Sequence, residues 1–178
     1  EGIYHAIDHG AGVINVSMSS PKNSTIIAEA IAEAQSRGII VVTAVDNRHS
    51  DDKVYPAANT GVIAVASTDM NNVKSAFSGF GYYVDLCAPG EDLVSILPNN
   101  QFAVASGTSF SAALVSGASA LVASRFEAQG FATMNSQLLQ SALDLTAANG
   151  DLAEGLGFGR VRPWQALQRL RPPPMRTR

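Results

Sequence analysis

Residues 13–45, VINVSMSSPKNSTIIAEAIAEAQSRGIIVVTAV, decide the fold class of this chain. The runs 13–18 and 39–45 are apolar and β-branched nearly throughout, which is typical of strands that are covered on both faces. The stretch between them predicts a helix with a polar cap at 23–24 and an end at Gly38. A strand, a helix and a second strand in this order form a βαβ unit, so the two strands are expected to be parallel.

The segments that follow continue the alternation of strand and helix. Residues 62–67, VIAVAS, predict a third strand of the same buried kind. The shorter runs 83–88 and 93–97 are expected to form a hairpin-like addition. Helices are predicted at 109–125 and near 135–146, and a last one follows the glycine turn that begins GFGR. The predicted class is α/β, with a mainly parallel, twisted sheet and helices on both faces.

The chain is expected to form one domain over residues 1–171, followed by a basic, proline-rich tail at 172–178 that is predicted to be disordered. Of the 178 residues, 46% are hydrophobic and 15% are charged, which favours a large core. The net charge of −3 gives no reason to expect binding to nucleic acid. The apolar run at 110–122 is too short and too rich in Ser and Gly to cross a membrane. A single cysteine, Cys87, rules out an internal disulfide and a cysteine-rich metal site.

A first candidate for chemistry lies in GTSFSAALVSGASALV, residues 107–122, within a run that carries no charged side chain. Ser109 stands at the predicted start of the helix, where free backbone N–H groups and the helix dipole favour developing negative charge. Gly107 would allow the backbone to approach a substrate closely. Taken alone, these residues also fit a simple turn and helix cap, and the cap is the commoner role for such residues.

A second candidate lies at the carboxyl ends of the strands, where open parallel sheets bind their ligands. The two ends are residues 17–21 and 45–50, and Asn47 stands in the second of them. A side-chain amide there can donate a hydrogen bond to an oxyanion, although a loop asparagine is the simpler interpretation. The three histidines are expected on the surface, and their spacing is not that of metal ligands. They are His5, His9 and His49.

Six segments of the chain resemble the subtilisin-like serine proteases, the subtilases. Residues 107–122 resemble the family's nucleophile motif, Gly-Thr-Ser-Met-Ala followed by a helix of small residues. Residues 38–50 resemble the strand that ends in Ala-Gly-Asn, and residues 10–21 resemble the strand that ends in Ser-Leu-Gly-Gly. The other similar segments are VYPAANTGVIAVASTD (54–69), SAFSGFGYYVDLCAPGEDLVSILP (75–98) and GFGRVRPWQAL (157–167). All six follow the family's order over nearly the whole chain.

The resemblance implies a serine endopeptidase with a subtilisin-like fold. Ser109 would be the nucleophile at the start of a buried central helix, and the Asn47 amide would form the oxyanion hole with the backbone N–H of Ser109. An extended polypeptide substrate would lie between two walls of a pocket. The first wall would consist of Ser17, Met18, Ser19 and Ser20. The remaining substrate-binding residues would be Ala44, Val45, Asp46 and Val54.

The family's catalytic aspartate and its histidine in a His-Gly-Thr-His motif belong upstream of the matched region, and neither motif occurs in this chain. The Asp-His pair at 8–9 falls on a surface helix of the family. The chain is therefore expected to be the C-terminal portion of a subtilase domain, incomplete at its N-terminal side. By itself it should be inactive, because Ser109 has no base to accept its proton. Its expected partners are a polypeptide substrate and the missing N-terminal half, supplied by the same gene or by another chain.

Several departures from the family pattern keep a non-catalytic relative open as an alternative. Asp46 replaces the glycine before the asparagine, and a carboxylate that faces the oxyanion hole would be unfavourable. Ser19 and Ser20 replace glycines of the substrate strand, which would narrow the groove. Ala113 and Leu114 replace Pro-His, a change that a helix accepts easily. The alternatives are a pseudoprotease that binds extended peptides without cutting them, and an unrelated α/β binding module.

The resemblance carries three further expectations. The Tyr55–Pro56 peptide bond should be cis, as it is in the family. No cofactor is required, although Asp69 could help to hold a calcium or alkali-metal ion; a solvated turn is the simpler role for this residue. The backbone carbonyls expected to join it lie near Ala57, Asn59 and Val62. A secreted or extracytoplasmic location is suggested by the resemblance alone.

Overall fold

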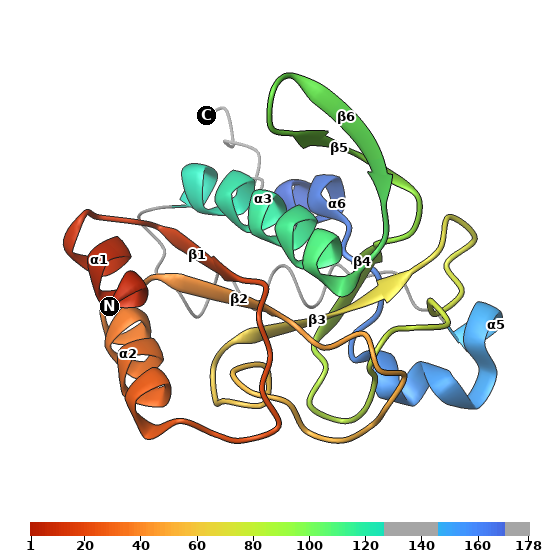
Figure 1. The fold of residues 1–178 in the computed structure, drawn as a ribbon, viewed down its shortest axis with the longest axis horizontal. Helices are drawn as coiled ribbons and strands as arrows, with labels where there is room; N and C mark the ends of the chain where they lie inside the picture. The colour runs from red at the N-terminus through yellow and green to blue at the C-terminus, as the bar shows by residue number, and fades with distance from the viewer. Residues whose placement is uncertain (127–145, 170–178) are drawn as a thin grey trace, which may run out of the picture.

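The computed structural model describes residues 1–126 and 146–169. Its centre is a sheet of four parallel strands in the order β1-β2-β3-β4, drawn as the red-to-green arrows of Figure 1. This arrangement confirms the predicted α/β class with a parallel sheet. The strands are β1 (Val13–Val16), β2 (Ile40–Ala44), β3 (Ile63–Thr68) and β4 (Leu86–Pro89).

Helices cover both faces of this sheet, as predicted. On one face, α1 (Gly2–Asp8) and α2 (Thr25–Ser36) bury Ile7 and Ile31 in a cluster that includes Val41 of β2. On the other face, the long α3 (Thr108–Phe126) and the short α6 (Pro163–Arg169) pack over β2, β3 and β4 (Figure 1). Strands β2 and β3 are buried along their whole length, which explains why they are apolar rather than alternating. The remaining described helices are α5 (Thr146–Asn149) and the 3₁₀ helix η2 (Gly150–Leu156).

Most of the predicted local boundaries agree with the structure to within two residues. The helix predicted at 109–125 begins one residue earlier, at Thr108, and Gly38 follows the end of α2 with φ +78°. Ser24 occupies the N-cap position of α2, but its side chain makes no capping hydrogen bond. The Tyr55–Pro56 bond is cis, as predicted. The predicted helix near 135–146 and the tail at 172–178 lie almost wholly outside the described residues.

The hairpin predicted from 83–88 and 93–97 is wrong. β4 joins the main sheet beside β3, because Leu86, Cys87 and Ala88 are fully buried and find a parallel partner there. β5 (Leu93–Leu97) pairs instead with β6 (Gln101–Ala105), an antiparallel strand that was not predicted from the sequence. Asn99 and Asn100 between them have positive φ values of 62° and 57°, the geometry of a tight hairpin turn. The Asn-Asn pair was the available signal for this turn.

Cys87 lies at the centre of β4 with no exposed surface, and its Sγ donates to the backbone carbonyl of Leu156 at 3.3 Å. Burial raises the pKa of the thiol to about 12, so almost no reactive thiolate exists in the folded chain near neutral pH. We expect the native chain to react with a disulfide reagent at pH 8 at least about 100-fold more slowly than the guanidinium-unfolded chain. Because the chain has one cysteine, all of the coloured thiol that the reagent releases reports the reaction of Cys87. Similar rates in the two states would show that β4 opens readily.

Candidate active site

Ser109 lies in the first turn of α3, and this helix begins on the side of the sheet where the strands end (Figure 1). The Gly107 N–H donates to the carbonyl of Gly90 at 2.7 Å, and the Phe110 N–H donates to the carbonyl of Gly107 at 3.0 Å. The first bond ties the start of α3 to the loop after β4, and the second closes the first turn of the helix. The body of the helix is anchored in the core by small and branched side chains on one face. They are Ala112, Val115, Ala118 and Val122.

Asn47 follows β2, and its side chain reaches the start of α3. Its Oδ1 accepts two hydrogen bonds from Thr108, one from the backbone N–H and one from the hydroxyl, each 3.0 Å long. The backbone N–H can only donate, so the Asn47 atom that it meets must be the amide oxygen. An amide oxygen can only accept, so the Thr108 hydroxyl must also be a donor. The amide is therefore oriented with its oxygen on Thr108 and its Nδ2 donor turned elsewhere.

The Nδ2 of Asn47 and the backbone nitrogen of Ser109 border the same small space beside Gly107. A Cβ placed on Gly107 would lie 3.4 Å from Asn47 Nδ2 and 3.9 Å from the Ser109 nitrogen. Because Gly107 has no side chain, this space remains open to a ligand atom. Two convergent N–H donors are what a developing oxyanion requires. The family resemblance implied both groups as oxyanion donors, and this role stays a prediction. The hydrogen bonds by which Thr108 orients the Asn47 amide were not predicted from the sequence.

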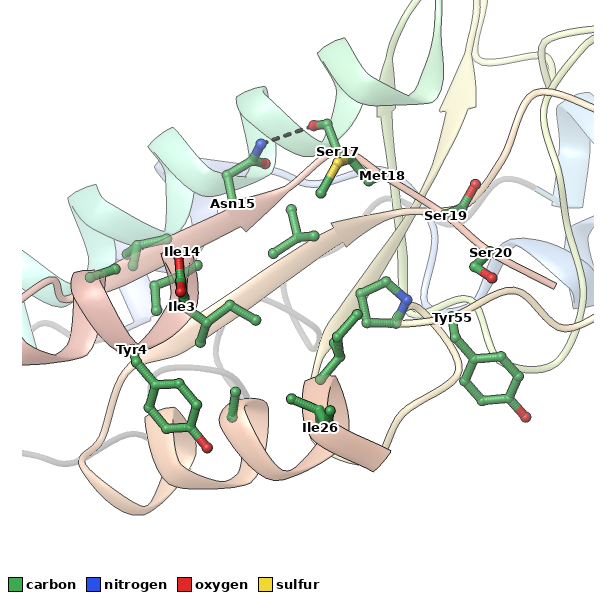
Figure 2. Close-up of a pocket in the computed structure, with 18 residues that line it drawn as sticks. Ile3, Tyr4, Ile14, Asn15, Ser17, Met18, Ser19, Ser20, Ile26 and Tyr55 are labelled. Carbon is green, nitrogen blue, oxygen red and sulfur yellow. Dashed lines mark hydrogen bonds between the residues drawn. The ribbon is translucent and has the colours of Figure 1, made fainter. Parts of the chain in front are cut away.

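The predicted first wall forms one end of an apolar groove of about 940 Å³. The groove lies between α1, β1 and the start of α2, with Tyr55 and Pro56 at its far side (Figure 2). Met18 is 74% exposed above it. The backbone N–H and carbonyl of Ser20 each form a hydrogen bond of 2.8 Å with the backbone of Tyr55. At this end of the wall the backbone groups of Ser20 are therefore already occupied. Ser17, Met18, Ser19 and Ser20 all line the groove.

The other predicted substrate-binding residues are buried and do not line this groove. Ala44, Val45 and Val54 are 4%, 0% and 0% exposed. The Asp46 carboxylate forms an ion pair with the guanidinium of Arg48 and also accepts the Arg48 backbone N–H at 3.2 Å. Its charge is thus compensated by the neighbouring residue rather than left facing a ligand. Their role in substrate binding stays a prediction.

None of the three histidines makes a hydrogen bond with Ser109 in the described part of the chain. His5 and His9 stack on each other on α1, with ring centroids 4.0 Å apart. The Nδ1 of His49 lies 3.1 Å from the Nζ of Lys74, an ammonium that can only donate. Burial lowers the pKa of Lys74, which also donates to the carbonyls of Ser75 and Ser78. All three histidines are exposed, as predicted.

The Asp69 carboxylate accepts backbone N–H donors from Asn71 and Val73, both at 2.8 Å, and so closes a turn after β3. Among residues 1–126 and 146–169, no group of three or more His, Cys, Asp or Glu side chains could hold a metal ion. A cation at Asp69 stays a prediction. None of the described helices is both long and apolar enough to cross a membrane.

A model of the subtilase family matches residues 1–159 of the chain. Thermitase of Thermoactinomyces vulgaris is 37% identical over 171 residues, which cover 94% of this chain and 58% of thermitase. Subtilisin BL of Lederbergia lenta is 34% identical over 149 residues, covering 84% of this chain and 55% of that protein. The chain thus spans little more than half the length of these relatives.

Solved structures of proteases share the same architecture. The prenylagaramide maturation protease PagA superposes with a TM-score of 0.85 at 28% identity, covering 93% of this chain and 64% of that one. MycP1 with its N-terminal propeptide removed gives a TM-score of 0.80 at 28% identity, with the same coverage of 93% and 64%. Both are similar in fold over nearly all of this chain and over about two thirds of their own.

Proposed function

The chain belongs to the subtilase family of serine proteases, and from this premise we propose that it forms the C-terminal portion of a peptidase that cuts peptide bonds through an acyl-enzyme. The observation that carries the proposal is the convergence of the Asn47 amide and the Ser109 N–H on the space beside Gly107. In the reaction, Ser109 Oγ bonds to the substrate carbonyl carbon as its proton passes to a base. The C–N bond then breaks, the amine leaves with that proton, and water releases the acyl group.

We propose that the base and its orienting carboxylate come from residues outside 1–178, either from the same gene or from another chain. No described histidine contacts Ser109, and the family's aspartate and histidine motifs do not occur here. A serine hydroxyl without a base is a poor nucleophile at neutral pH. Residues 1–178 alone are therefore expected to be inert. An extracytoplasmic location rests on the family resemblance alone.

The substrate that fits best is a polypeptide in extended form. Residues 17–20 leave the end of β1 and border the apolar groove of Figure 2, so a peptide could pair with them while its side chains enter the groove. The oxyanion donors require neither a metal nor an organic cofactor for this chemistry. A structural cation at Asp69 is a separate proposal and plays no part in the mechanism.

The test titrates two proteins with a fluorophosphonate, which labels an activated serine. One is residues 1–178 alone, and the other is the complete protein, meaning this chain together with the N-terminal half of the domain, from the same gene or from a second chain. We expect Ser109 to be labelled stoichiometrically in the complete protein only, and Ser109→Ala to abolish the labelling. Labelling of the short chain would show that residues 1–178 contain a base.

A peptide-binding relative without catalysis is the second candidate. Two features favour a substrate groove that is narrower than in the family. The backbone of Ser20 is already paired with Tyr55, and serines stand at 19 and 20 where the family has glycines. If neither protein is labelled while an extended peptide still binds to the complete protein, this second function replaces the first.

A further inference from the structure

A chain of three side-chain hydrogen bonds connects β1 to α3 at two points. The one proton of the Ser116 hydroxyl is shared between Asn15 Oδ1 and the carbonyl of Ala112, each 2.9 Å from Ser116 Oγ. Asn15 Nδ2 donates to Ser17 Oγ at 2.9 Å. Ser17 Oγ then donates to the backbone carbonyl of Ser109 at 3.2 Å. Figure 2 shows the central bond, between Asn15 and Ser17, on the side of β1 next to α3.

The direction of this chain is fixed by its last acceptor. The carbonyl of Ser109 can only accept, so the Ser17 hydroxyl must donate to it. The same hydroxyl then accepts from the Asn15 amide, whose oxygen is left to accept from Ser116. Ser116 lies two helical turns beyond Ser109. The bond from Ser17 to the carbonyl of Ser109 therefore holds the β1 segment against the start of α3, and the shared bond of Ser116 is a weaker second contact two turns away.

Among the described strands only β2 pairs with β1, so the side-chain bonds to α3 are a second described connection that fixes the position of β1. The segment that leaves β1, residues 17–20, is the proposed platform for the peptide substrate. The nucleophile stands on α3, a different element. The distance between the attacking oxygen and the bound carbonyl therefore depends on how β1 is held relative to the first turn of α3.

We propose that Ser17 is a positioning residue that, with Asn15 and Ser116, keeps the substrate strand in register with Ser109. This inference rests on the proposed peptidase function. The oxyanion donors belong to α3 and to the loop after β2, so they do not depend on the brace. A small reagent that uses only Ser109 and the oxyanion hole should be indifferent to it. An extended peptide, which also needs residues 17–20, should be sensitive.

The experiment uses the complete protein and compares two rates: kcat/KM for an extended peptide, and the rate constant for fluorophosphonate labelling. In Ser17→Ala we expect the peptide rate to fall roughly tenfold to a hundredfold relative to the labelling rate, since small misplacements of reacting groups are costly. Asn15→Asp should do the same without a cavity, because a carboxylate cannot donate to Ser17 and draws its hydroxyl away from Ser109. Most of this loss should appear in kcat.

Two further variants complete the test. Ser17→Thr keeps the hydroxyl and should restore most of the peptide rate. Ser124→Ala, which removes an exposed α3 hydroxyl bonded only to its own helix, should leave both rates unchanged. An unchanged ratio of the two rates in Ser17→Ala and Asn15→Asp overturns the inference while the peptidase function stands. An unreactive wild-type protein overturns both.

Discussion

Replacing Asn47 with alanine in the complete protein is expected to lower kcat for peptide hydrolysis by roughly 10² to 10³, the loss measured for a subtilisin when its oxyanion amide is removed. The physical reason is that Nδ2 meets the oxygen only when negative charge develops on it, so the interaction stabilises the transition state more than the bound substrate. KM should therefore change little. The measurement is steady-state hydrolysis of a peptide substrate at neutral pH.

Asn23→Ala is the matched control for Asn47→Ala. Asn23 is exposed before the start of α2 and is not among the residues that line the groove, so its replacement should leave kcat within about twofold. Asn47→Ala also removes the acceptor for Thr108, so the unfolding transitions of both variants are compared with that of the wild type. A loss of less than about fivefold in a stably folded Asn47→Ala protein would remove Asn47 from the oxyanion hole.

Gly157→Ala is expected to destabilise the chain strongly, lowering the free energy of unfolding by about 3 kcal/mol or more. A Cβ at this position would lie 2.5 Å from the carbonyl oxygen of Val84 and closer still to that of Asp85. Both are backbone atoms beside β4, which cannot turn away as a side chain would. Gly157 also has φ +62°, a conformation that costs other residues energy. Urea unfolding of the variant and the wild-type chain measures the difference.

Two other glycines separate the causes of this loss. Gly150 has φ +54° but nothing within 4 Å of an added Cβ, so Gly150→Ala should cost only the conformational part, about 1–2 kcal/mol. Gly117 lies within α3 with nothing within 4 Å and no positive φ, so Gly117→Ala should stabilise by about 0.5–1 kcal/mol. If Gly157→Ala costs no more than Gly150→Ala, the contact with β4 yields easily and the steric argument is wrong.

Patterns that act over a few residues were sufficient for much of the fold. The apolar runs at β2 and β3 predicted buried parallel strands, and the small-residue run predicted α3 within one residue of its start. β1 is parallel as predicted, but only Ile14 of this strand is buried, so the prediction that both of its faces are covered is wrong for the described residues. The partner of β4 was missed, because an apolar run of four residues fits a hairpin and a central strand equally well. The choice depends on which neighbour buries Cys87 more fully, and this neighbour is β3.

For the candidate site, too, part could be predicted from the sequence and part depends on the tertiary structure. The sequence by itself determined which residue types were available: a serine at the start of a helix, an amide after a strand, and three histidines, none of them in a His-Gly-Thr-His motif. Only the tertiary structure decided how they are oriented. Thr108 turns the Asn47 amide, Arg48 compensates the carboxylate of Asp46, and Ser17 reaches the carbonyl of Ser109 across 92 positions of sequence. Hydrogen bonds of this kind join residues that no local periodicity relates, so their direction follows only from the packing of β1 and β2 against α3.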